Sequence, residues 1–126
     1  MPPVSITFFR ELDGHVPVLE WLDRLRVEDR QAYSRCEVRL HRLEIMGHEL
    51  RRPDADYVGN GLYELRVRRG HVNFRLIYCF HGREIVVLLH ALTKEDRLPE
   101  TDLRRALDRK FRLECNPGLH IEQGEP

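Results

Sequence analysis

Residues 61–92, GLYELRVRRGHVNFRLIYCFHGREIVVLLHAL, predict three consecutive β-strands and decide the fold. Apolar and polar side chains alternate from Leu62 to Arg68, which is typical of a strand with one face in the core. The segment from Ile85 to Leu92 is almost wholly apolar, which indicates a strand at the centre of a sheet. The predicted strands are 62–68, 73–80 and 85–92, and glycine-containing turns at 69–71 and 81–83 separate them.

One further strand and two helices are expected before these strands. Residues 5–9, SITFF, have the β-branched and aromatic composition of a strand. Pro17 suits the first position of a helix that carries apolar residues as far as Leu25. Apolar residues at spacings of three and four then predict a longer helix from about Glu28 to Met46, and Gly47 is placed to end it.

The rest of the chain is expected to contribute a last helix and two irregular segments. Residues 48–60 are polar and rich in turn signals, and Pro99 begins the last helix. Its buried side is expected to hold Leu103, Ala106, Leu107 and Phe111. The order β-α-α-β-β-β-α predicts an α+β fold, in which a small, mainly antiparallel sheet is covered by a helix pair and a C-terminal helix. We expect one domain over residues 1–115 and a flexible tail over residues 116–126.

The composition excludes several classes of protein. The chain has 126 residues, of which 41% are hydrophobic and 33% charged, as is typical of a globular domain. Its longest apolar run, residues 85–89, is far shorter than the roughly 20 residues of a membrane span, and its N-terminus lacks the pattern of a signal peptide. The three cysteines and seven histidines show no metal-ligand spacing. We therefore expect a cytoplasmic protein that uses no metal and no cofactor and does not associate with a membrane.

Basic charge is concentrated in the predicted strands. The whole chain has 21 basic and 21 acidic residues, and its net charge is zero. Residues 61–83 hold five arginines and a single glutamate, which gives this segment a net charge of +4. A basic segment in an otherwise neutral protein favours local binding of a polyanion over general attraction to nucleic acid.

Five segments, found in order and with regular strand spacing, carry a likeness to a known family. They are Gly14–Leu22, Gly61–Arg66, Phe74–Tyr78, Val87–Lys94, and Pro99 with the helix that follows it. From about Ile6 to Cys115 the chain resembles the RelE/ParE superfamily of toxins from bacterial toxin–antitoxin modules, and within it the phage-derived HigB-like branch. The resemblance implies a RelE-like fold and cleavage of messenger RNA on the ribosome without a metal ion. It also implies a cognate antitoxin, which in this branch is usually a helix-turn-helix protein.

Cleavage of RNA without a metal requires a deprotonated 2′-hydroxyl, in-line attack on phosphorus, and stabilisation of additional negative charge. Arginine suits the last task because its planar fork donates two hydrogen bonds to phosphate oxygens and stays charged. Arg66 and Arg75 fall on adjacent predicted strands, and Lys94 follows the third. These three residues are the expected catalytic cations. The alternative is that Arg66 and Arg68 belong to an ordinary solvated strand surface.

Four further residues are candidates for the site, and two of them also have a structural interpretation. Glu64 shares a strand face with Arg66 and is expected to act as a base or to orient an arginine; the alternative is an ordinary ion pair. His90, with an ordinary pKa of about 6.5, is expected to contact RNA; the alternative is a hydrogen-bonded structural histidine. Arg68 and Arg97 are expected to bind the RNA backbone.

One departure from the family pattern bears on activity. This branch usually has two basic residues after the third strand, whereas here Glu95 and Asp96 follow Lys94. Two acidic side chains at that place repel an RNA backbone. Three functions therefore stay open: a translation-dependent endoribonuclease, a ParE-like toxin that binds a protein such as DNA gyrase, and an inactive relative that only binds its antitoxin.

Overall fold

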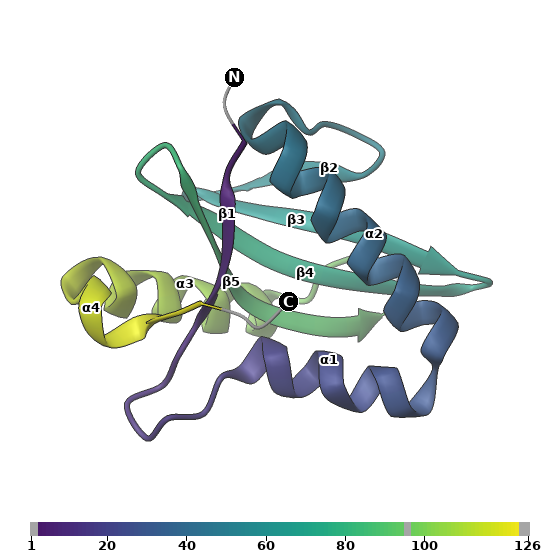
Figure 1. The fold of residues 1–126 in the computed structure, drawn as a ribbon, viewed down its shortest axis with the longest axis horizontal. Coiled ribbons are helices and arrows are strands. Elements are labelled where there is room, and N and C mark those ends of the chain that lie inside the picture. Colours follow the sequence, from purple (N-terminus) through teal and green to yellow (C-terminus); the bar gives the residue numbers. More distant parts are fainter. Residues whose placement is uncertain (1–2, 95–96, 124–126) are drawn as a thin grey trace.

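The computed structural model describes residues 3–94 and 97–123, which form a six-stranded sheet with helices on both faces (Figure 1). The strands are β1 (Ser5–Phe9), β2 (Ala55–Gly59), β3 (Leu62–Arg69), β4 (Val72–His81), β5 (Ile85–Lys94) and β6 (Ile121–Glu122). The helices are α1 (Pro17–Glu28), α2 (Arg30–Met46), α3 (Glu100–Cys115) and the short α4 (Pro117–His120), and a 3-10 turn, η1 (Gly47–Glu49), follows α2. The mixed α+β class predicted from the sequence is confirmed.

The strands of the sheet run in the order β2-β3-β4-β5-β1-β6. β1 lies parallel to β5, and the other four neighbouring pairs are antiparallel. The three strands predicted between residues 62 and 92 are β3, β4 and β5, and they occupy consecutive positions in the sheet. The antiparallel pairing from β3 to β5 is therefore the part of the fold that the sequence predicts best.

Each face of the sheet has its own apolar core. α1 and α2 cover one face, and α2 runs diagonally across the sheet (Figure 1). Members of this first core include Leu22, Leu43, Leu65, Tyr78 and Leu88. α3 packs on the opposite face, where the core includes Phe9, Ile77, Leu89, Ala106 and Leu113. The side chains of β3, β4 and β5 alternate between these two cores, as the period of a strand requires.

Asp29 separates the two N-terminal helices. Its backbone N–H donates to the carbonyl oxygen of Leu25 at the end of α1, and its side chain accepts a hydrogen bond from the N–H of Ala32 at 3.1 Å. Asp29 is thus the C-cap of α1 and the N-cap of α2, which explains why α2 begins at Arg30. At the other end of α2, Gly47 has a φ of 55°, a value that favours glycine, and the predicted helix end is confirmed.

Residues 48–60, expected to be irregular, contain η1 and the edge strand β2. β2 pairs antiparallel with β3, and Tyr57 lies opposite Tyr63. Ala55 is buried, but the rest of β2 is half-buried or exposed. Backbone pairing with β3, more than burial of side chains, therefore holds this polar segment in the sheet, and polarity alone gave the wrong expectation.

The chain also forms regular structure after residue 116, where a flexible tail was expected. α4 follows α3 directly, and β6 pairs with β1. His120 is buried, its Nδ1 lies 2.7 Å from the carbonyl oxygen of Arg10, and its ring stacks on Phe9 with centroids 5.0 Å apart. This hydrogen bond and ring contact place residues 117–122 against β1 and replace the expected tail over that range.

The inward side of α3 differs from the one predicted. Leu107 and Phe111, expected in the core, are 37% and 65% exposed, whereas Ala106 and Leu113 are buried. The guanidinium of Arg109 occupies an inward position and donates from Nη1 to the carbonyl oxygen of Leu89 at 2.8 Å. Because Arg109 takes an inward position on α3, Leu107 and Phe111 lie outside the core.

Truncation of Leu43 tests the assignment of the buried side of α2. Because Leu43 is fully buried, Leu43→Ala is expected to lower the free energy of unfolding by about 2–5 kcal/mol. Val38 lies on the same helix but is 67% exposed, so Val38→Ala is expected to change it by less than about 0.5 kcal/mol. Urea unfolding followed by circular dichroism measures both values, and equal losses would contradict the assignment.

Candidate functional site

The register of β3 and β4 brings together two of the predicted catalytic residues. Arg66 and Arg75 lie directly opposite one another across the two strands. Side chains at directly opposed positions leave the sheet on the same face, so both arginines project toward the side on which α3 packs. Glu64, two residues before Arg66 on β3, projects from this face as well.

Glu64 is buried, and its carboxylate interacts with both guanidinium groups. Arg75 Nη1 donates a hydrogen bond to Glu64 Oε1, and Arg66 Nε lies 3.4 Å from the same oxygen. The ion pair, which is one of the two interpretations of Glu64, is therefore present. Like charges directly opposite one another destabilise a sheet, and a carboxylate between them offsets that repulsion.

A second carboxylate extends these contacts to the edge of the sheet. Asp56 on β2 places Oδ2 3.3 Å from Arg66 Nη2 and 2.9 Å from Arg52 Nη2. The hydrogen bond from Arg52 lowers the pKa of Asp56, so this carboxylate is ionised at neutral pH. We call the five residues Arg52, Asp56, Glu64, Arg66 and Arg75 the arginine cluster. It carries three positive and two negative charges.

The two central arginines of the cluster differ in their exposure. The side chain of Arg66 is 42% exposed, whereas that of Arg75 is 12% exposed. An anion that approaches from solvent therefore meets Arg66 first, and Glu64 holds Arg75 behind it. The excess of one positive charge and the planar forks of the arginines suit a phosphate group.

Lys94, the third predicted cation, is the last residue of β5, and its backbone lies opposite Asn73 on β4. Its side chain lies outside the part of the chain that the structure describes, as do Glu95 and Asp96. The predicted contribution of Lys94 to the site therefore stays a prediction.

Arg68 and Arg97, the two arginines expected to bind the RNA backbone, are both exposed. Arg68 is on β3, two residues beyond Arg66 on the same strand face, and its Nε donates to the carbonyl oxygen of Gly70 at 3.0 Å. Arg97 follows β5 and is exposed. Arg68 thus extends the basic face of β3 beyond the arginine cluster.

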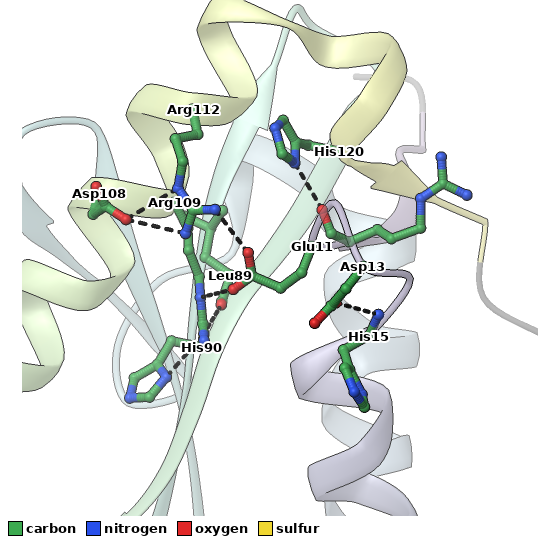
Figure 2. A network of polar contacts seen from close by, with 10 residues as sticks. Glu11, Asp13, His15, Leu89, His90, Asp108, Arg109, Arg112 and His120 are labelled. Atoms are coloured by element: carbon green, nitrogen blue, oxygen red, sulfur yellow. Dashed lines mark hydrogen bonds and ion pairs between the residues drawn. The ribbon is translucent and has the colours of Figure 1, made fainter.

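His90 is buried and belongs to a separate polar network between β5 and α3 (Figure 2). Its Nε2 lies 2.6 Å from Asp102 Oδ1, and its Nδ1 lies 3.3 Å from Arg109 Nη1. Because a guanidinium only donates, Nδ1 must accept and Nε2 must carry the proton of a neutral imidazole. Burial lowers the pKa of His90, which favours this neutral form. These contacts support the alternative of a structural histidine over direct contact with RNA.

Arg109 joins α3 to the segment that follows β1, as Figure 2 shows. Its Nε lies 3.6 Å from Glu11 Oε2, and Arg112 Nη1 lies 2.7 Å from Glu11 Oε1. Burial lowers the pKa of Arg109, whereas the hydrogen bond to Glu11 raises the pKa of Arg112. The network therefore fastens α3 to the sheet, and it is distinct from the arginine cluster.

Tyr78 and Tyr63, which the strand alternation places in the core, lie on the face covered by α1 and α2. Tyr78 is fully buried, and burial raises its pKa, so it stays protonated. Tyr63 is half-buried and packs against the same core. Neither ring lies on the face of the arginine cluster: Tyr78 belongs to the core, and Tyr63 packs at its edge.

Sequence reasoning missed six charged residues that take part in the two networks: Glu11, Arg52, Asp56, Asp102, Arg109 and Arg112. Asp56 lies in the polar stretch that gave no strand signal. Asp102 lies in the first turn of α3 and Arg109 in its C-terminal half, where their charges suit the helix dipole. Charge that suits a helix dipole does not reveal which side chain turns toward the sheet.

Two further observations concern the described residues 3–94 and 97–123. Within them, no group of three or more histidine, cysteine, aspartate or glutamate side chains is arranged to hold a metal ion. Within the same ranges, the helices are all too short or too polar to cross a membrane.

The pH dependence of stability tests the network at His90, which Asp102 and Arg109 contact and Arg105 approaches. Because burial lowers the pKa of His90 below its ordinary 6.5, the unfolded chain binds the proton more readily. The stability contribution of His90 is therefore complete above about pH 6.5 and is lost as the pH falls. Urea unfolding from about pH 8 to pH 5 is expected to show a smaller loss for His90→Gln than for wild type.

His71→Gln is the matched control, because His71 lies in an exposed turn. It is expected to keep the pH profile of the wild-type protein. Identical profiles for wild type and His90→Gln would contradict the assignment of a neutral, buried imidazole.

A model of phage-derived proteins described as Gp49-like (DUF891) matches residues 20–110, a range that contains α2, β2 to β5 and the arginine cluster. No curated protein matches the chain. Because the family model covers well over half of its length, the chain belongs to the Gp49-like family of phage-derived proteins.

Proposed function

We propose that this protein is the toxin of a type II toxin–antitoxin module and cleaves messenger RNA on the ribosome without a metal ion. Membership of the Gp49-like family supports the toxin part of this proposal. The observation that carries the nuclease part is the placement of Arg66 directly opposite Arg75, with the Glu64 carboxylate between them.

In the proposed reaction, the 2′-oxygen of one nucleotide loses its proton to a base and attacks the adjacent phosphorus. The bond from phosphorus to the 5′-oxygen breaks, and that oxygen takes up a proton. The products are a 2′,3′-cyclic phosphate and a 5′-hydroxyl. Negative charge on the non-bridging oxygens increases in the transition state, so fixed cationic donors at those oxygens accelerate the reaction.

Each member of the cluster has a role in this proposal. Arg66 is the catalytic residue that contacts the phosphate, because it is the more exposed of the two opposed arginines. Arg75 adds positive charge behind it, and Glu64, which is buried, is a positioning residue that fixes both guanidinium groups. Lys94 at the end of β5 is proposed as a further cation, and Arg68 and Arg97 as contacts to the RNA backbone.

The proposal includes a partner and a location. A toxin of this kind requires a cognate antitoxin, and we propose a helix-turn-helix protein encoded beside this chain. Action on translated messages places the protein in the cytoplasm. A gene for a small helix-turn-helix protein next to this one would be consistent with both statements.

A second candidate function is a toxin that acts by binding a protein such as DNA gyrase. The low exposure of Arg75 favours it, because a guanidinium that is 12% exposed and paired with Glu64 suits a structural role. An inactive relative that only binds its antitoxin is the third candidate. The same cellular experiment separates all three.

Induced expression in bacteria, with primer extension on messenger RNA, tests the nuclease proposal. Wild type is expected to stop growth and to produce cuts in translated messages. Arg66→Ala is expected to lower the rate of cutting by about 10²–10³-fold, because it removes one donor to the charge of the transition state. Arg75→Ala is also expected to lower the rate of cutting and to relieve growth arrest, because it removes positive charge behind Arg66 and leaves the buried Glu64 carboxylate without its hydrogen-bond donor.

Arg104→Ala is the matched control, because Arg104 is 77% exposed on α3 and pairs with Glu100 one turn away. It is expected to cut at the rate of the wild type. Growth arrest with intact messages and damaged DNA would move the assignment to gyrase binding, and the absence of any arrest would indicate an inactive relative. Circular dichroism of each purified variant separates loss of catalysis from loss of folding.

A further inference from the structure

A hollow of about 520 Å³ lies at the β2 edge of the sheet, beside the arginine cluster. Its lining includes two tyrosines, Tyr57 and Tyr63, and three charged residues, Arg51, Arg52 and Asp56. The volume falls within the roughly 300–1,000 Å³ that is usual for small-molecule sites. Aromatic rings and arginines therefore meet in a space large enough for one flat ligand group.

Tyr57 presents an exposed ring that is held at both ends. The residue is 56% exposed, its backbone pairs with β3 in the sheet, and its hydroxyl oxygen accepts a hydrogen bond from the Gly61 N–H at 3.0 Å. Its ring lies 5.0 Å from that of Tyr63, and Tyr63 stacks in turn on the buried Tyr78 with centroids 5.5 Å apart. A ring fixed in this way loses little conformational entropy when a second ring stacks on it.

The charged residues of the hollow connect it to the proposed site of cleavage. Arg52 is 75% exposed, and the Asp56 Oδ2 that it contacts is also within 3.3 Å of Arg66 Nη2. One carboxylate oxygen of the edge strand thus lies between Arg52, which lines the hollow, and Arg66 on the other face of the sheet. Tyr57 lies opposite Tyr63 and therefore on the face covered by α1 and α2, whereas Arg66 projects from the other face. A ligand with a flat ring on Tyr57 can place an attached anionic group beside Arg52, and a strand that continues around the edge strand β2 reaches Arg66.

We propose that this hollow binds an unpaired nucleobase of an RNA strand that continues around the edge strand β2 to the linkage held at Arg66. This inference rests on the proposed function and names a subsite for its substrate. Single-stranded nucleic acids are bound in this manner, with bases stacked on aromatic side chains and the backbone along cationic ones. An acidic peptide would also be attracted by Arg51 and Arg52, but it would gain nothing from a fixed, exposed ring.

The test is binding of a fluorescein-labelled hexa-adenylate with 2′-O-methyl riboses, which cannot be cleaved, measured by fluorescence anisotropy. Tyr57→Ala is expected to weaken binding by about 5- to 150-fold, the range for loss of one base–aromatic stack. Tyr57→Phe keeps the ring and removes only the hydroxyl, so it is expected to bind within about threefold of the wild type. Urea unfolding of both variants checks that they are folded.

A second measurement needs no protein variant. Each base of the hexanucleotide in turn is replaced by an abasic residue, and one replacement is expected to weaken binding to the wild-type protein as much as Tyr57→Ala does. The inference is overturned by equal affinity of all abasic strands, by equal affinity of Tyr57→Ala and wild type, or by failure of the wild type to bind. If polyglutamate displaces the strand and no abasic replacement changes the affinity, the hollow is assigned to an acidic peptide instead.

These results are separable from the test of cleavage. If the wild type cuts messages and Tyr57→Ala binds the hexanucleotide equally well, the subsite is wrong and the nuclease proposal stands. If binding depends on Tyr57 but no message is cut, the subsite stands and the nuclease proposal is wrong.

Discussion

The pairing register of β3 with β4 determines where Glu64, Arg66 and Arg75, the centre of the arginine cluster, lie. Side chains alternate along a strand, so a slip of one residue would move Arg66 to the opposite face from Arg75. The register places two like charges directly opposite one another, which by itself is unfavourable, and the buried Glu64 carboxylate offsets that repulsion. A carboxylate and two arginines that stabilise one another in this way also form a compact group of donors suited to a phosphate.

The face of the sheet that carries this cluster is divided between two polar networks with different properties. Near β5, His90 is buried, and its contacts with Asp102 and Arg109 fasten α3. Toward β2, the contacts of Arg66 and Asp56 lead to the edge strand and to solvent. The buried network gives the rigidity that a preorganised site needs, and the open one is where a ligand has access.

The sequence predicted those parts of the fold in which side-chain burial follows a regular period. The alternation of apolar and polar side chains identified β3. The same alternation placed Glu64 and Arg66 on one face of that strand. β2 was missed because only Ala55 of its five residues is buried, so its side chains show no regular apolar period. The segment after residue 116 was missed because Asn116-Pro117-Gly118 resembles a chain end, while the buried ring of His120 that anchors it gives no local signal.

The site was predicted in part for the same reason. The shared face of Arg66 and Arg75 follows from strand pairing, but the Asp56 contact that continues the cluster depends on a strand the sequence did not reveal. The partners of His90 lie 12 and 19 residues away on a helix, and no sequence period reports the orientation of that helix. The inward position of Arg109 likewise depends on how α3 packs.

The most direct measurement of the central claim is a double-mutant cycle on the free energy of unfolding, with Glu64→Gln, Arg75→Met and the two changes together. If the Glu64 carboxylate holds Arg75 in place, the losses of unfolding free energy in the two single variants add up to more than the loss in the double variant, by at least about 1 kcal/mol. Additive losses, within about 0.5 kcal/mol, would show that the two residues are not coupled and would contradict the account.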